Sequence, residues 1–117
     1  MFENENENEP SLTAIQWFNK GYDYDVKEDY DNAIFAYTKA IELNPQDGDA
    51  YINRGVVYDT KGQYDLAIRD YDKMIELNPQ AVDVYINKVS ACEKSGDYTS
   101  SQIEAVKQKI RDLGGQI

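Results

Sequence analysis

Carboxylates are the most plentiful reactive side chains in this sequence, with 22 Asp and Glu among 117 residues. Such groups serve as general acids and bases or as calcium ligands. The pair Asp23 and Asp25 has the spacing of the first two ligands of a calcium loop. Lys27, however, stands where the next ligand belongs, and no glycine follows it. We therefore interpret this spacing as chance and expect no metal site.

Other groups that support catalysis are missing from the sequence. There is no His, so an imidazole base and a His metal ligand are both excluded. Cys92 is the only cysteine, and its place in the pattern predicts a small buried hydrophobe rather than a reactive thiol. Gly114 and Gly115 end a segment instead of opening a helix, so they do not form a phosphate loop. The sequence therefore predicts a protein that is not an enzyme and holds no cofactor.

The charge balance favours some partners over others. Twelve Lys and Arg against 22 acids give a net charge of −10. This balance argues against nucleic acids and anionic membranes, whose phosphates need clustered cations. It favours neutral or basic partners, although the same acids would also keep a small domain soluble.

The first residues, MFENENENEP, lack the basic and apolar regions of a secretory signal, and no apolar run has the length of a membrane span. We expect a cytoplasmic protein with a disordered acidic leader at residues 1–12.

A 34-residue repeat organises the rest of the chain. Residues 14–47 and 48–81 are identical at half of their aligned places, including the run IELNPQ. The third copy, from residue 82, keeps Tyr85, Asn87, Gly96, Asp97 and Tyr98 and then diverges. A fixed period of this length indicates stacked supersecondary units.

Particular recurring residues resemble the tetratricopeptide repeat pattern. They are Trp17/Tyr51/Tyr85, Gly21/Gly55, Tyr24/Tyr58, Ala33/Ala67/Ser101, Tyr37/Tyr71 and Pro45/Pro79. The resemblance implies an all-α fold, a right-handed superhelical array of antiparallel helix hairpins. It also implies a single domain over residues 13–117, with repeats at 14–47, 48–81 and 82–115. Such arrays are scaffolds that bind other proteins.

Local signals predict where the helices begin and how they pack. Thr13 with Gln16 fits a capping box, and Asp29 and Asp47 are expected to cap the next two helices. Gly21 and Gly55 lie inside helices, where each glycine costs about 1 kcal/mol, so we expect them to allow the close approach of Ala33 and Ala67. Gly62 is expected in a left-handed turn, whereas Glu28 at the equivalent place argues against one.

Tyrosine is abundant, but nine of the ten occupy recurring places. We interpret these nine as core side chains whose hydroxyls reach the surface, and Tyr22 as the exception.

The last helix differs from its counterparts. Val89 replaces the recurring glycine, and Ser101 with Glu104 offers a capping box for a late start. Its apolar residues Ile103, Val106, Ile110 and Leu113 form one narrow stripe. We therefore expect the segment 101–113 to cap the array with a polar outer face.

The resemblance places a partner-binding groove along the first helix of each unit. Helical spacing agrees, because Phe18, Tyr22 and Asp25 lie three or four residues apart. The apolar groove residues fall outside the expected core, so they predict a dry binding stripe. The candidate partner-binding residues are Ile15, Phe18, Asn19, Tyr22 and Asp25, then Asp49, Ile52, Asn53, Val56 and Asp59, then Asp83, Ile86, Asn87, Ser90 and Glu93.

One asparagine recurs in all three units, as Asn19, Asn53 and Asn87. Amides offer both a donor and an acceptor, so the three could hold the backbone of a bound peptide. Alternatively, they face water or support the neighbouring helix.

We hypothesise that the groove binds a neutral-to-basic, partly apolar protein segment. The alternative is a homo-oligomer that forms through the groove or through one end of the array. Family members that clamp the acidic C-terminal tails of chaperones use cationic and amide side chains. Here those places hold Phe18, Tyr22, Asn53, Asp83 and Asn87, of which only Asn53 fits. An acidic groove would also repel a carboxylate tail, so we expect no binding of such tails.

Overall fold

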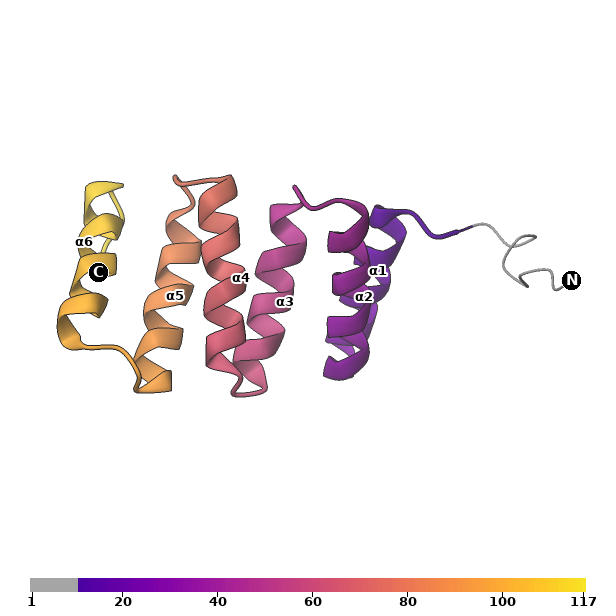
Figure 1. Cartoon of the computed structure of the whole chain (residues 1–117), viewed down its shortest axis with the longest axis horizontal. Helices are drawn as coiled ribbons and strands as arrows, with labels where there is room; N and C mark the ends of the chain where they lie inside the picture. Colours follow the sequence, from indigo (N-terminus) through magenta and orange to yellow (C-terminus); the bar gives the residue numbers. More distant parts are fainter. Residues whose placement is uncertain (1–10) are drawn as a thin grey trace, which may run out of the picture.

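Six helices stand side by side in sequence order in the computed structural model, which describes residues 11–117 (Figure 1). The part of the chain that is described contains no strand, as the all-α prediction requires. The predicted leader lies outside the described residues, apart from Ser11 and Leu12. The helices are α1 (Ala14–Val26), α2 (Tyr30–Leu43), α3 (Gly48–Thr60), α4 (Tyr64–Leu77), α5 (Val82–Ser95) and α6 (Ser100–Asp112).

Two of the predicted caps form as expected. The Thr13 hydroxyl accepts a hydrogen bond from the Gln16 backbone at 3.1 Å, and the Gln16 side chain accepts one from the Thr13 backbone at 2.8 Å. Asp47 accepts from the backbone N–H of Ala50 at 3.3 Å. Asp29 occupies the N-cap position of α2, but its carboxylate accepts from the Asn32 side chain at 2.8 Å instead of from the backbone.

The capping box predicted for α6 is wrong. Thr99 is the N-cap, and its hydroxyl accepts from the Gln102 backbone at 3.1 Å while Gln102 accepts from the Thr99 backbone at 2.8 Å. This pair has the same Thr-x-x-Gln spacing as Thr13 and Gln16. The extended backbone of Thr99 (φ −74°, ψ 158°) lets its hydroxyl reach the first turn, so α6 begins at Ser100.

The helix glycines allow close packing, but against tyrosines and not against the alanines that we expected. A Cβ atom on Gly21 would lie 2.6 Å from the ring of Tyr37, and one on Gly55 would lie 2.8 Å from the ring of Tyr71. These two rings are the largest buried side chains in their helices, so they reach further across the hairpin than an alanine can.

The turn between α1 and α2 also differs from expectation. Glu28 adopts the left-handed conformation with φ 61°, as Gly62 does with φ 79°. The backbone N–H of Glu28 donates to Asp25 and that of Asp29 donates to Tyr24, both at 2.9 Å. These bonds close the hairpin and stabilise a conformation that glutamate itself disfavours.

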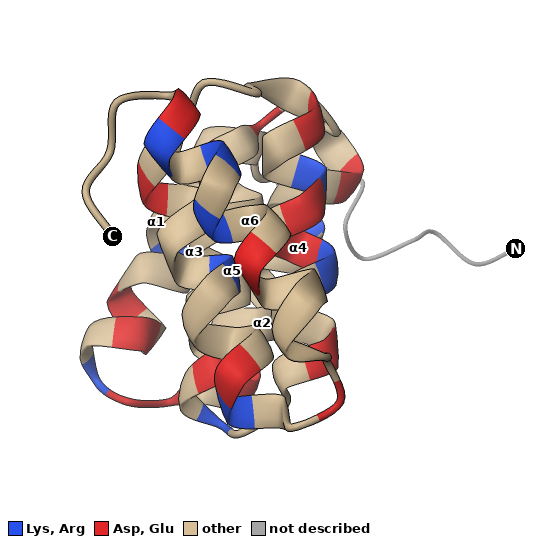
Figure 2. Ribbon diagram, turned by 90° about the vertical axis from the view of Figure 1, so that its left-hand side faces the viewer, with Lys and Arg blue, Asp and Glu red and all other residues tan. Residues whose placement is uncertain are grey.

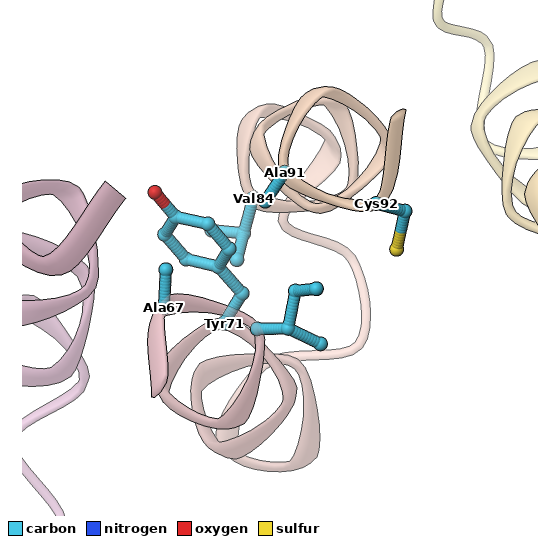
Figure 3. Close-up of a cluster of buried hydrophobic side chains, with 6 residues drawn as sticks. Ala67, Tyr71, Val84, Ala91 and Cys92 are labelled. Carbon is cyan, nitrogen blue, oxygen red and sulfur yellow. The ribbon is translucent and has the colours of Figure 1, made fainter. Parts of the chain in front are cut away.

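The core lies between successive helices. Figure 3 shows Tyr71 of α4 beside Ala67, opposite Val84 and Ala91 of α5, in a cluster that also contains Cys92. Cys92 is 2% exposed, and burial raises the pKa of its thiol, so the group stays protonated. This environment supports our interpretation of Cys92 as a buried hydrophobe.

Helix α6 is the last described helix and packs against α5. Its apolar stripe packs against Tyr85 and Val89, and Ile110 is fully buried. Lys, Arg, Asp and Glu are spread over the helices (Figure 2), and on α6 Glu104, Lys109, Arg111 and Asp112 are exposed. None of the described helices is long and apolar enough to cross a membrane.

Candidate functional site

Helices α1, α3 and α5 carry the predicted binding residues. Helices α1 and α3 lie on one side of the array and α4 on the other (Figure 2). Helix α3 contacts α1, and Lys94 of α5 reaches Asp59 of α3 at 3.2 Å. We call this surface the groove face. It comprises Ile15, Phe18, Asn19, Tyr22, Asp25, Asp49, Ile52, Asn53, Val56, Asp59, Asp83, Ile86, Asn87, Ser90 and Glu93.

Two clefts open between the helices of the groove face. A small one of about 120 Å³ lies between α1 and the start of α3, lined by Ile15, Phe18, Asp47 and Asp49. A larger one of about 440 Å³ lies further along the array. Its lining is Val56, Asp59, Thr60, Tyr64, Tyr71, Asn87, Ser90 and Lys94.

The apolar residues of the groove face divide into two groups. Tyr22 and Val56 are 55% and 41% exposed, and Ile15 and Ile86 are also exposed. Phe18 is partly buried with its ring 5.6 Å from that of Tyr37, and Ile52 packs against the core of the second hairpin. The prediction that all of these residues lie outside the core is therefore wrong for Phe18 and Ile52, because the first helix of a hairpin must also pack against the second.

The carboxylates of the groove face are not equally free. Asp59 pairs with Lys94 at 3.2 Å, and Glu93 pairs with Lys107 of α6 at 3.8 Å. Asp49 and Asp83 are exposed and form no ion pair among residues 11–117. Free negative charge on the groove face is thus concentrated in the first turns of α3 and α5.

Two carboxylates of the groove face, Asp25 and Asp59, accept hydrogen bonds from buried tyrosine hydroxyls. Tyr37 donates to Asp25 at 3.3 Å, and Tyr71 donates to Asp59 at 3.4 Å. Burial raises the pKa of both hydroxyls and the nearby carboxylates raise it further, so the phenols stay protonated as donors. Burial also raises the pKa of Asp25, against the hydrogen bond from Tyr37, which lowers it. These two hydroxyls do not reach the surface as we expected of the recurring tyrosines.

The recurring asparagines differ in their surroundings. Asn53 donates from Nδ2 to the Tyr37 hydroxyl at 3.5 Å, so one chain of hydrogen bonds links α1, α2 and α3. This contact fits the alternative that the amide supports the neighbouring helix. Asn19 is exposed, and Asn87 lines the larger cleft beside Tyr71.

A buried ion pair that the sequence interpretation missed fixes the middle of the array. The Arg54 guanidinium donates to both Asp70 carboxylate oxygens at 2.9 and 2.7 Å and to the Thr38 hydroxyl at 3.0 Å. It also lies over the rings of Tyr51 and Tyr58. Arg54 therefore ties α2, α3 and α4 together. The available signal was a cation at the same place in every unit, since Lys20, Arg54 and Lys88 are 34 residues apart.

Comparisons with known proteins agree with this architecture. The sequence model of the family described as "Tetratricopeptide repeat" matches residues 14–47 and 48–81. No curated protein sequence matches the chain significantly.

Similar solved structures include the TPR2B domain of yeast Sti1 in a pHsp70 complex. It is 30% identical over 88% of this chain and 81% of that chain, with a TM-score of 0.77. The MamA protein is 29% identical over 86% of this chain, with a TM-score of 0.81, and this chain spans 54% of MamA. The first TPR of Spaghetti (RPAP3) bound to the HSP90 peptide SRMEEVD is 22% identical over 89% of this chain and 81% of that chain, with a TM-score of 0.77, so it shows the fold alone. From the matched repeats and from the likeness to Sti1, the chain belongs to the tetratricopeptide repeat family.

Proposed function

We propose that this protein is an interaction module that binds a neutral-to-basic, partly apolar segment of another protein along the groove face. The observation that carries the proposal is the combination of exposed Tyr22, Val56 and Ile86 with two exposed carboxylates, Asp49 and Asp83, that form no ion pair within the described part of the chain. An apolar strip of this kind binds apolar side chains. The net charge of −10 would attract a cationic ligand over a longer range.

The spacing of the units supports an extended ligand. Neighbouring units are expected to stand about one helix diameter apart, roughly 10 Å, and an extended chain rises about 3.3 Å per residue. One unit would therefore meet roughly every third ligand residue. Asn19 and Asn87 could then bond to the ligand backbone, and Asn53 could do so through its amide oxygen.

Acidic chaperone tails do not suit this surface. The Sti1 domain is in complex with pHsp70, and RPAP3 binds SRMEEVD, a peptide with three acidic side chains. In this chain Asp83 stands on the groove face beside Asn87, and Asp49 is also free. We propose that repulsion between these carboxylates and the peptide prevents such binding. Titration with SRMEEVD is expected to show no saturable binding, and micromolar affinity would contradict the exclusion.

A peptide display screen, followed by calorimetry with the selected peptides, tests the main proposal. Extended peptides with Lys or Arg beside apolar residues should be enriched. The double variant Asp49→Asn, Asp83→Asn should bind them about tenfold more weakly, because it removes two attractive charges. The matched control Asp65→Asn, Asp97→Asn makes the same charge change at exposed positions around another cleft. Equal loss in both variants would mean that net charge alone, and not the groove face, determines binding.

The exposed apolar residues also suit a second candidate function, self-association through the groove face. Sedimentation at several concentrations separates the two functions. A dimer that Val56→Arg dissociates would favour self-association, because Val56 is a groove residue without a role in the buried core.

A further inference from the structure

Among residues 11–117, no helix packs on the outer face of α1, unlike the starts of the other two hairpins. Helix α2 packs against α3, and α4 packs against α5, whereas α1 is the first described helix (Figure 1). In α3 and α5, one face is covered by the helix that precedes it. We call the equivalent face of α1, together with Phe35 of α2, the N-terminal face. It comprises Trp17, Lys20 and Phe35.

In the second and third units, the residues equivalent to Trp17 and Lys20 are more buried than Trp17 and Lys20 themselves. Tyr51 and Tyr85, which are equivalent to Trp17, are only 8% and 7% exposed, while Trp17 is more open to solvent. Phe35 is 54% exposed and contacts Trp17 edge to face, with 5.8 Å between the ring centroids. An aromatic pair of this size at the surface indicates an interaction site.

Charge indicates the chemistry of a helix that would pack on the N-terminal face. Arg54 and Lys88, which are equivalent to Lys20, are largely buried and bond to the preceding helix. Arg54 donates to Thr38 at 3.0 Å, and Lys88 pairs with Asp72 at 2.7 Å. Lys20 is exposed and has no ion-pair partner among residues 11–117. We propose that the N-terminal face docks an amphipathic helix of a partner protein that sets an apolar stripe on Trp17 and Phe35 and a carboxylate beside Lys20.

A second copy of the chain fits this face less well. The C-terminal end offers α6, whose residues equivalent to Tyr71 and Asp72 are Ala105 and Val106, so it presents no acid for Lys20. Two N-terminal faces in contact would set Lys20 of one copy against the surface that carries Lys20 of the other. The proposal is independent of the groove face, because none of its residues belongs to that surface.

The chain supplies both a probe and a reporter for the test. Trp17 is the only tryptophan, so its fluorescence reports on the N-terminal face directly. A peptide copying residues 63–80 contains α4, the helix that already packs against α5 through Asp72, and it has no tryptophan. Titration of this peptide into the full chain should shift Trp17 emission to the blue and saturate.

Charge exchange makes the test specific. The same peptide with Asp72→Lys should bind the wild-type chain about tenfold more weakly, and should regain affinity for the Lys20→Glu chain. Groove variants such as Val56→Arg should leave the titration unchanged. Three outcomes would overturn the proposal: no shift at millimolar peptide, equal affinity for both peptides, or Trp17 emission that is already blue-shifted in the free chain, whether monomer or dimer.

Discussion

At the scale of single residues, Gly21 and Gly55 allow the two helices of a hairpin to approach closely. Replacing Gly21 or Gly55 with Ala gains about 1 kcal/mol of helix propensity, yet the new Cβ would lie within 2.8 Å of a buried tyrosine ring. We therefore expect Gly55→Ala to lower the free energy of unfolding by about 2 kcal/mol, since rigid neighbours cannot yield. Urea denaturation measures this.

Gly48→Ala is the matched control, because its Cβ would meet only the Met74 side chain, which can move. A stabilising Gly55→Ala would contradict the packing argument.

Asp25 supplies a pH-dependent prediction. Its pKa is raised above the unfolded value, so the folded state binds its proton more tightly and the ionised form reduces stability at neutral pH. The residue also lies in the last turn of α1, where negative charge is unfavourable. Asp25→Asn should therefore stabilise the fold at pH 7 by about 0.5 kcal/mol, the size of a charge–dipole interaction.

The difference between Asp25→Asn and wild type should vanish as the pH falls through the raised pKa of Asp25. Thermal melts from pH 7 to 3 follow it. A gap that stays constant over this range would show that the charge of Asp25 is not its cause.

At the scale of elements, the buried Arg54–Asp70 pair joins the two helices of the second hairpin, α3 and α4. Asp70 is 4% exposed, so Arg54→Leu would leave a buried carboxylate without its partner. We expect a loss of about 3–5 kcal/mol in the free energy of unfolding. Replacing both residues, as Arg54→Leu with Asp70→Leu, should recover most of it, because no charge is then left buried.

Chemical denaturation of the three variants completes the double-mutant cycle. Additive losses would show that the two side chains act independently and that the tie has another origin.

At the scale of the whole molecule, contacts run mainly between neighbouring helices. One end of the array should therefore be able to unfold while the other end stays folded. Ile110 is fully buried in the stripe by which α6 covers α5. Ile110→Asp should expose the amides of α5 and α6 to hydrogen exchange while those of α1 and α2 stay protected.

Ala105→Asp is the control, since Ala105 is exposed on the same helix. Uniform loss of protection along the chain would instead indicate a single cooperative unit.

The sequence alone was sufficient to predict the array and its helices. Hydrophobic periodicity, the caps at Thr13 and Asp47 and the breaks at Pro45 and Pro79 are local signals, and repetition of the same unit averages out their errors. The same signals did not predict the start of α6, because two nearby residues could each act as its N-cap. Ser101 and Thr99 both offer a capping box to α6, and only the path of the chain after Tyr98 selects Thr99.

Only the tertiary structure decided which polar side chains are free to bind. Asp25, Asp59 and Glu93 look alike in the repeat, yet Tyr37, Lys94 and Lys107 engage them, and Asp49 and Asp83 remain open. The partners come from other helices, up to 35 residues away along the chain. Sequence spacing fixes which residues share one helix face, but charge pairing between helices depends on how those helices pack, and that packing exists only in the folded array.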